Sequence, residues 1–460
     1  MNKNYAKEET ILKKYIVDAS VFLFAPYALG AFDDNEVIIA KSTLRQITET
    51  AHKGTGESRA NAIEFSRLLD SLFDSPGASV SLENGGLLVI AGHGSEDIYT
   101  IAASENATIV TRDPIMRVMA KSLDIPSEAF RSEQLVTSAH PYEGRCNLYV
   151  SANEMQTFAQ DKSLYLSSDN SYIATDTDGE TISENYRLTP NEYVTLINAE
   201  SPNGGTMLGR FDGTRIVPLL YKKDHPVYGV TARNAGQMFA LDALTNPDAP
   251  LVILRGPAGT AKTFLSMAAG LEQTINTNIY KRILVTRPNT KMDNDVGFLK
   301  GDEVEKVLPS LRGLLDNIDD LMGGSRGRET KDNQPLGSYL YDLMESGIVE
   351  AQAMAYMRGR SIKYQYMVVD EMQNSTATQA LSIITRIGDF SKIVLLGDPA
   401  QIDSPYLDSK SNGLTYAAER MKGSPLCWQV TFSQKETTRS ALAKEAIERM
   451  SPKNRLFTLE

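Results

Sequence analysis

The chain has 460 residues and a formal net charge of −11, with 42% hydrophobic and 23% charged residues. This length exceeds one ordinary core and predicts about two or three globular domains, and no apolar run reaches the roughly 18 residues that a membrane helix needs. The acidic balance excludes a broad nucleic-acid-binding surface, which is normally basic, so any contact with nucleic acid should be local.

Residues 15–130 alternate short apolar runs with helical patterns. Strands are predicted at residues 15–17, 37–40, 87–91 and 108–111. Between the second and the third, Phe65, Leu69 and Leu72 form one stripe of a predicted helix. Strands that alternate with helices predict a parallel sheet, so residues 1–135 are expected to form an α/β domain.

Three aspartates lie at the ends of these elements. Asp18 ends the first strand, Asp97 opens a helical pattern, and Asp113 follows the strand at 108–111. The carboxyl ends of parallel strands meet at one edge of a sheet, where these acids could bind Mg²⁺ or Mn²⁺ and activate water against a phosphodiester. The spacing is equally compatible with three acids that each cap a helix.

Residues 136–226 differ from the segments on either side. Turn-forming pairs recur there, including Asp169-Asn170 and Asp178-Gly179, between short β-prone runs such as residues 193–197 and 215–220. An Asp-Gly pair flanked by such runs is typical of a β-hairpin. We therefore predict a small all-β module, which joins the first domain to a second α/β domain at residues 227–460.

The third region contains apolar, β-rich runs typical of the centre of a parallel sheet, at residues 251–254, 282–286, 366–369 and 392–396. The first of these runs leads into a P-loop pattern, which an Ala-rich helical pattern follows. The nucleotide-binding residues predicted there are Gly256, Pro257, Ala258, Gly259, Thr260, Ala261, Lys262 and Thr263.

The chemistry of phosphate binding explains these residues. Glycines let backbone N–H groups turn toward phosphate oxygens at a helix N-terminus. Lys262 would reach the β- and γ-phosphates of ATP, and the Thr263 hydroxyl would bind Mg²⁺. Ala261 departs from the usual pattern, which has glycine before the lysine. A Cβ there is tolerated at negative φ and costs free energy at positive φ.

An acidic pair follows the strand at 366–369. Asp370 could hold Mg²⁺, and Glu371 could polarise the water that attacks the γ-phosphate. The alternative is that both acids only favour the start of the next helix. The P-loop upstream favours the catalytic interpretation.

Several motifs in this region follow one another in a characteristic order. They are the P-loop, Thr286-Arg287-Pro288, Arg358-Gly359-Arg360, Asp370-Glu371-Met372-Gln373-Asn374, Thr385-Arg386-Ile387-Gly388, and Gly397-Asp398 with Gln401-Ile402-Asp403. Over about residues 227–444 this order resembles the PhoH family of ATPases, which are similar to the core of superfamily 1 helicases.

The resemblance implies roles for three more residues. Gln401 would sense the γ-phosphate, Gln237 would read adenine, and Arg439 would act as an arginine finger in catalysis. Because an arginine finger often acts across a subunit interface, the resemblance also implies a ring-like homo-oligomer. The simpler alternatives are that Gln401 belongs to an ordinary loop and that Arg439 is a solvated helix residue.

Motifs in the N-terminal region carry a second resemblance. They are Ile16-Val17-Asp18-Ala19-Ser20, Asp97 and Ile109-Val110-Thr111-Arg112-Asp113. Over about residues 12–130 they resemble a PIN nuclease domain, and a PIN domain joined to a PhoH ATPase implies RNA unwinding and cleavage. PIN domains normally carry another acid on the helix after the second strand. Arg45 or Gln46 stands at that place here, with Glu49 one turn further, so we expect nuclease activity to be weak or absent.

The favoured interpretation is an ATP-dependent RNA-remodelling enzyme that acts on single-stranded RNA and carries a PIN domain that binds or cuts it. One alternative is an ATP-gated assembly protein on a catalytically dead PIN scaffold, and another is a nuclease whose P-loop is only structural. Cys146 and Cys427 are too far apart for a disulfide framework or a zinc site of the usual spacing. The expected location is therefore the reducing cytoplasm.

Overall fold

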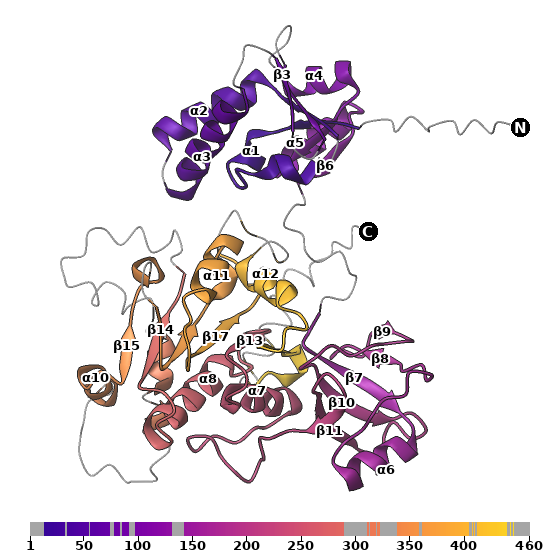
Figure 1. Cartoon of the computed structure of the whole chain (residues 1–460), viewed down its shortest axis with the longest axis vertical. Helices are drawn as coiled ribbons and strands as arrows, with labels where there is room; N and C mark the ends of the chain where they lie inside the picture. The colour runs from indigo at the N-terminus through magenta and orange to yellow at the C-terminus, as the bar shows by residue number, and fades with distance from the viewer. Residues whose placement is uncertain are drawn as a thin grey trace, which may run out of the picture. The chain divides into compact units, whose positions relative to one another are not determined.

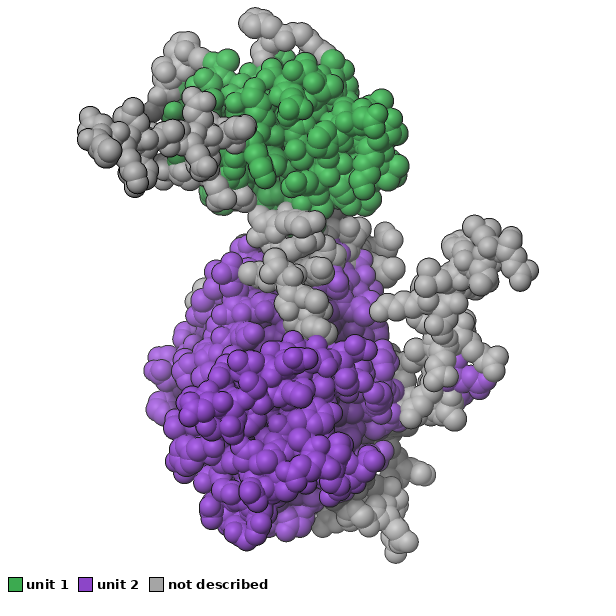
Figure 2. Space-filling model, turned by 90° about the vertical axis from the view of Figure 1, so that its right-hand side faces the viewer, with its two compact units in different colours: residues 1–134 green, residues 135–460 purple. Residues whose placement is uncertain are grey.

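The computed structural model describes most of the chain. The described residues are 13–32, 35–54, 56–73, 78–82, 85–91, 97–130, 142–288, 311, 313–318, 320–322, 338–357, 361–403, 407, 409, 412–438, 442 and 445. The chain divides into two compact units, residues 1–134 and 135–460 (Figures 1 and 2). Within the described ranges, no helix has the length and apolar character that crossing a lipid bilayer requires.

The first unit is built on one sheet. Its strands are β1 (Lys14–Val17), β2 (Glu36–Ile39), β3 (Ser79–Ser81), β4 (Leu87–Ile90), β5 (Thr108–Thr111) and β6 (Ser127–Ala129). They lie in the order β3-β4-β2-β1-β5-β6, and only β3 pairs antiparallel. The helices are α1 (Ala19–Phe22), α2 (Lys41–Lys53), α3 (Gly56–Leu72), α4 (Ile98–Glu105) and α5 (Pro114–Ser122), with a 3₁₀ turn η1 (Ala28–Phe32).

Both faces of this sheet are covered by apolar side chains, because successive strand residues point to opposite faces. Ile16 of β1 packs in one buried cluster with Ile109, and the adjacent Val17 packs in the other with Phe65 of α3. The predicted α/β class is confirmed, and the four predicted strands match β1, β2, β4 and β5 to within one residue at each end.

The second unit begins with a mixed sheet. Its strands are β7 (Arg145–Val150), β8 (Ala174–Thr175), β9 (Thr181–Ser183), β10 (Tyr193–Asn198), β11 (Thr206–Phe211) and β12 (Ile216–Pro218), in the order β12-β11-β10-β7-β8-β9. The prediction of an all-β module is wrong in one respect, because helix α6 (Ala152–Asp161) follows β7. Ser151 and Glu154 form a reciprocal capping box at its start, and Phe158 anchors it in the core. This helix is part of the connection between β7 and β10, which pair in parallel.

The rest of the second unit is a parallel sheet with helices on both faces (Figure 1). Its strands are β13 (Leu251–Arg255), β14 (Arg282–Thr286), β15 (Val349–Ala351), β16 (Gln365–Val369), β17 (Lys392–Gly397) and β18 (Cys427–Thr431), in the order β15-β14-β16-β17-β13-β18. Its described helices include α7 (Ala235–Thr245), α8 (Lys262–Leu271), α10 (Ser338–Glu345), α11 (Ala377–Ile384) and α12 (Gly413–Arg420). Shorter turns are η2 (Glu272–Asn276), η4 (Met354–Met357), η5 (Met372–Asn374) and η6 (Gln434–Glu436).

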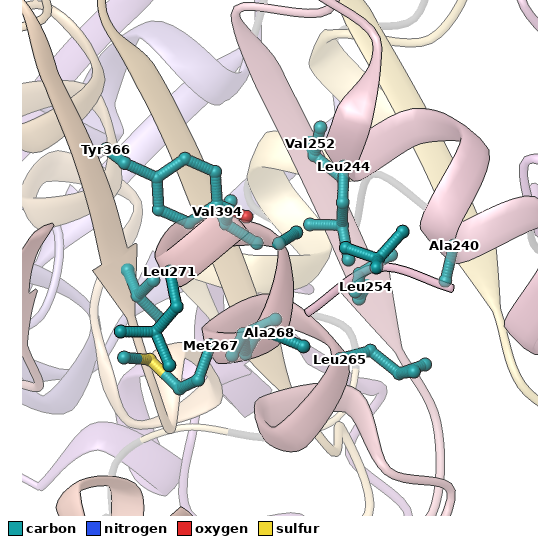
Figure 3. Packing of buried hydrophobic residues seen from close by; sticks show 14 of the residues in the cluster. Ala240, Leu244, Val252, Leu254, Leu265, Met267, Ala268, Leu271, Tyr366 and Val394 are labelled. Atoms are coloured by element: carbon teal, nitrogen blue, oxygen red, sulfur yellow. The ribbon is translucent and has the colours of Figure 1, made fainter. Parts of the chain in front are cut away.

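Buried aliphatic residues hold helix α8 against this sheet. Figure 3 shows Val252 and Leu254 of β13 and Val394 of β17 near Leu265 and Met267 of α8 in one cluster. All five side chains are essentially without exposed surface. Burial of this kind stabilises by about 25 cal/mol per Å² of apolar area, and it fixes the position of the loop between β13 and α8.

The two sheets of the second unit meet in one buried cluster. Tyr193 of β10 stacks on Phe239 of α7 with ring centroids 4.9 Å apart, and its edge meets Trp428 of β18 at 6.2 Å. The Tyr193 hydroxyl donates to Asp242 Oδ2 at 2.9 Å. The β-rich module is therefore packed directly against the elements that carry the P-loop.

Candidate active site

The loop between β13 and α8 has the backbone of a phosphate-binding loop. Gly256 has φ +136°, and a Cβ placed on it would lie 2.6 Å from the Phe432 carbonyl oxygen. Gly259 has φ +84°. Only glycine adopts the φ of Gly256 without strain. Both this turn and the close approach of Phe432, which follows β18, therefore require glycine at position 256.

Ala261, the departure from the usual P-loop pattern, lies in the left-handed region with φ 70° and ψ 22°. A side chain in this conformation costs roughly 1–2 kcal/mol relative to glycine. The methyl group packs against the main buried cluster of the second unit, which offsets part of this cost. The loop therefore keeps the P-loop conformation at some expense in stability.

Residues from separate motifs meet beside this loop. Lys262 is 8% exposed, and its ammonium donates to the carbonyl oxygens of Gly256 at 2.6 Å and Pro257 at 3.0 Å. The Thr263 hydroxyl donates to Asp370 Oδ2 at 3.3 Å, although the two residues are 107 positions apart. The parallel pairing of β13, β17, β16 and β14 brings their carboxyl ends to one edge of the sheet, where this contact forms.

The donor set at this edge fits a magnesium ion. Desolvation raises the pKa of the Asp370 carboxyl, and the charge of Glu371 raises it further, whereas Lys262 lowers it only in part. A desolvated acidic pair of this kind gains from a divalent cation, and hydroxyl and carboxylate oxygens are the ligands that Mg²⁺ prefers. Thr263 and Asp370 would hold the ion.

Gln373 is a site residue to which the sequence motifs assigned no role. Its side chain is fully buried, and its Nε2 donates to a carboxylate oxygen of Glu371 and to the Gln401 carbonyl oxygen at 2.8 Å. Its Oε1 accepts from the Asp398 backbone N–H at 3.2 Å. The signal for this role in the sequence was the position of Gln373 shortly after the Asp370-Glu371 motif, because a polar residue that is buried there needs several hydrogen-bond partners.

The loop after β17 is hydrogen-bonded to η5, the turn that contains Gln373. The Asn374 amide donates to Asp403 Oδ2 at 3.1 Å and accepts from the Asp403 backbone N–H at 2.8 Å. Gln401 Nε2 donates to Asp398 Oδ2 at 2.9 Å, and the Gln401 side chain is exposed. Gln401 thus belongs to the group around Glu371, and its proposed contact with the γ-phosphate stays a prediction.

Gln237 lies beside the P-loop. It is 3% exposed, its Oε1 accepts from the Arg233 N–H at 2.9 Å, and its Nε2 is 3.5 Å from the Thr260 carbonyl oxygen. Its role in reading adenine stays a prediction. Arg439 and the motif at 358–360 lie outside the described residues. Thr438, next to Arg439 in the sequence, donates to the Gly259 carbonyl oxygen through its N–H at 2.8 Å and its hydroxyl at 2.9 Å.

The three N-terminal aspartates each cap a helix. Asp18, Asp97 and Asp113 accept hydrogen bonds from backbone N–H groups at 3.0, 2.9 and 2.8 Å, at the starts of α1, α4 and α5. Burial, followed by the charges of Asp97, Asp113 and Asp18, raises the pKa of Tyr99. Among the described residues, however, no group of three or more His, Cys, Asp or Glu side chains could hold a metal ion.

Helix α2 presents a hydroxyl to this region. Thr43 is buried and donates to the Val17 carbonyl oxygen at 3.3 Å, next to Asp18. Arg45, Gln46 and Glu49 are exposed or nearly so on the same helix. Metal binding at Asp18, Asp97 and Asp113 therefore stays a prediction.

Comparisons with known proteins agree with this geometry. Residues 229–451 match the family model described as PhoH-like protein. The chain is 32% identical to protein PhoH2 of Bacillus subtilis (strain 168), over 94% of this chain and 99% of that protein. It is 27% identical to PhoH2 of Mycolicibacterium smegmatis, over 96% and 99%, and 34% identical to protein PhoH of Escherichia coli (strain K12), over 47% and 57%. The PhoH2 matches thus include the N-terminal unit.

Proposed function

Since this chain belongs to the PhoH family of P-loop ATPases, we propose that it uses ATP hydrolysis to remodel single-stranded RNA. The contact between Thr263 and Asp370 carries the catalytic part of the proposal, because it joins the phosphate loop to the acidic pair. The RNA part is supported by the order of the helicase-like motifs and by the N-terminal α/β unit, residues 1–134, which precedes them.

The residues divide the work of hydrolysis between them. Lys262 would exchange its two loop carbonyls for the β- and γ-phosphate oxygens and offset their charge. Thr263 and Asp370 would hold a magnesium ion, which would supply further positive charge to the site. Glu371, whose carboxylate accepts a hydrogen bond from Gln373, would orient the attacking water and accept its proton.

Hydrolysis of ATP in the presence of Mg²⁺, with and without single-stranded RNA, tests this function directly. We expect turnover that rises with RNA and is lost in Lys262→Ala, because that variant removes the cation that faces the phosphates. Turnover equal to that of Lys262→Ala under every condition would remove the central claim.

A second candidate function is an ATP-gated assembly protein whose N-terminal unit is catalytically inert. The helix-capping role of Asp18, Asp97 and Asp113 favours it, because a capping carboxylate is already engaged. Turnover that ignores RNA, together with nucleotide-dependent changes in native mass, would support this candidate over the first. Mg²⁺- or Mn²⁺-dependent RNA cleavage that disappears in Asp18→Asn would instead show that the N-terminal unit is active.

We also propose that the chain forms a homo-oligomer, on the basis of the arginine finger that the family implies at Arg439. Such a finger often completes the active site of a neighbouring subunit. Native mass spectrometry with and without a non-hydrolysable ATP analogue measures the assembly, and a monomer under both conditions would contradict it.

A further inference from the structure

The carboxylate of Glu436 joins three parts of the second unit. Glu436, in η6, forms a bidentate ion pair with Arg145 of β7. Arg145 Nη1 donates to Oε1 at 3.0 Å, and Nη2 donates to Oε2 at 2.6 Å. It also accepts from the backbone N–H groups of Gly236 at 2.8 Å and Ser433 at 3.0 Å. Its four donors therefore come from the β-rich module, from the start of α7 and from the segment after β18.

Both of the last two segments touch the nucleotide site. Gly236 immediately precedes Gln237, whose side chain reaches toward Thr260 of the P-loop. Two residues after Glu436, Thr438 donates hydrogen bonds to the Gly259 carbonyl oxygen from its N–H and from its hydroxyl. Asn234, which caps α7, also donates to the Glu436 backbone carbonyl at 3.3 Å. Glu436 therefore lies between the two stretches of chain that flank the P-loop.

The junction is tightly packed. The side chain of Arg145 is 6% exposed and that of Glu436 is 12% exposed. A Cβ placed on Gly236 would lie 2.7 Å from both carboxylate oxygens and 2.9 Å from Arg145 Nη1. A desolvated, bidentate pair allows little variation in geometry, so a displacement on one side is transmitted to the other.

We propose that Glu436 and Arg145 are positioning residues of the nucleotide site, which fix the segments beside the P-loop against the β-rich module and so set the affinity for ATP. The inference rests on the proposed ATPase function and extends it, because it gives the β-rich module a part in nucleotide binding. Neither side chain touches the phosphates; they act through Gly236 and Thr438.

The test compares Glu436→Gln with the wild-type full chain. Glutamine places an N–H group against donors and removes the charge that Arg145 faces. We expect the KM for ATP and the Kd for a fluorescent ATP analogue to rise about tenfold, as loss of one hydrogen bond to a charged group predicts. We expect kcat to change less than about threefold, because Lys262, Asp370 and Glu371 remain in place.

The double variant Arg145→Met with Glu436→Gln separates positioning from simple stability. Removing one charge leaves the other buried and unpaired, whereas removing both relieves that penalty. We expect the double variant to melt closer to the wild type than Glu436→Gln does, with Kd for the ATP analogue still raised. A Kd that returns to the wild-type value together with the melting temperature would overturn the proposal.

Lys435→Ala provides the matched control. Lys435 adjoins Glu436 and also faces the module, where its Nζ donates to the Asp178 carbonyl oxygen at 3.1 Å and lies 4.0 Å from Asp178 Oδ1, but the two side chains are 70% and 59% exposed. Its removal should leave KM and Kd unchanged, because a solvated pair constrains little. An unchanged Kd in Glu436→Gln would also overturn the inference. Analogue binding can be measured even if the wild type fails to hydrolyse ATP. Such a failure would count against the proposed function and not against the role of Glu436.

Discussion

Glu371 owes its orientation to a buried neighbour. It lies in the left-handed region with φ 53°, and its carboxylate accepts a hydrogen bond from Gln373. Gln373 also donates to the Gln401 carbonyl oxygen and accepts from the Asp398 N–H. The P-loop pattern was enough to predict where Lys262 and Thr263 lie, because their positions depend on local backbone. The partners of Gln373 could not be predicted in this way, since they depend on how the loop after β17 returns to the site.

Replacing Gln373 with methionine tests this arrangement. Methionine has a similar volume but cannot bridge Glu371 and Gln401, so we predict that kcat falls by roughly tenfold to a hundredfold with a smaller change in KM. Steady-state ATP hydrolysis measures both constants. Gln379→Met is the control, because Gln379 only completes the capping box of α11 with Thr376. Wild-type kcat in Gln373→Met would contradict the assigned role.

The strained residue of the P-loop offers a second test at this scale. Ala261→Gly removes a Cβ from left-handed backbone but loses its contact with the core and adds freedom to the unfolded chain. We predict that the free energy of unfolding rises by up to about 1 kcal/mol. Ala258→Gly, in the same loop but without positive φ, should instead lower it by about 0.5–1 kcal/mol. Urea unfolding distinguishes the two signs, and a fall in both variants would show that Ala261 is not strained.

At the scale of the elements, the buried side chain of Lys392 links β17 to α7. Lys392, at the start of β17, is fully buried and donates to the carbonyl oxygens of Ala243 at 3.1 Å and Asn246 at 2.7 Å. These carbonyls belong to the end of α7, which lacks further helical donors. Burial lowers the pKa of Lys392 from 10.5 to about 7. The lysine thus satisfies the helix end, at a cost that depends on pH.

The sign of this dependence follows from proton binding. Between about pH 7 and pH 10.5 the unfolded chain keeps the proton of Lys392 and the folded chain releases it, so stability rises with pH. We predict a gain of about 2 kcal/mol from pH 7 to pH 9 in the wild type relative to Lys392→Met. Urea unfolding of both proteins at the two pH values measures it. Equal changes in the two proteins would show that Lys392 does not titrate in this range.

The elements also show where sequence patterns fail. Four strands of each α/β sheet were predictable because each is a short apolar run, namely β1, β2, β4 and β5 in the first unit and β13, β14, β16 and β17 in the second. The strands β3, β6, β15 and β18 were not predicted. Helix α6 has a capping box and a single buried Phe158, but the many turn signals around it pointed to hairpins. The parallel pairing of β7 with β10 joins residues far apart in sequence, and no local pattern specifies such a pair.

At the scale of the whole molecule, the core clusters decide how many parts the chain has. The first unit has its own buried clusters on the two faces of its sheet. The β-rich module has a buried cluster around Phe158 and also contributes Tyr193 to the cluster that contains Phe239 and Trp428. The predicted boundary near residue 226 separates two sheets that meet in this second cluster, and the compact units divide at residues 134 and 135.

This division predicts two thermal unfolding transitions. A non-hydrolysable ATP analogue at about a hundred times its Kd should stabilise only the transition of the second unit, by about 2.7 kcal/mol, because the P-loop lies there. Scanning calorimetry with and without the analogue measures both transitions. Lys262→Ala should lose most of the shift, whereas a third transition for residues 136–226 would show that the module unfolds by itself.

The shared cluster also limits how this chain can be cut for laboratory use. Separation at residue 226 would remove Tyr193 and leave the ring faces of Phe239 and Trp428 open to water. Exposed aromatic surface of this kind promotes aggregation. A fragment meant to retain the P-loop in soluble form should therefore begin before β7, near residue 135, so that the sheet that shields these rings is kept with it.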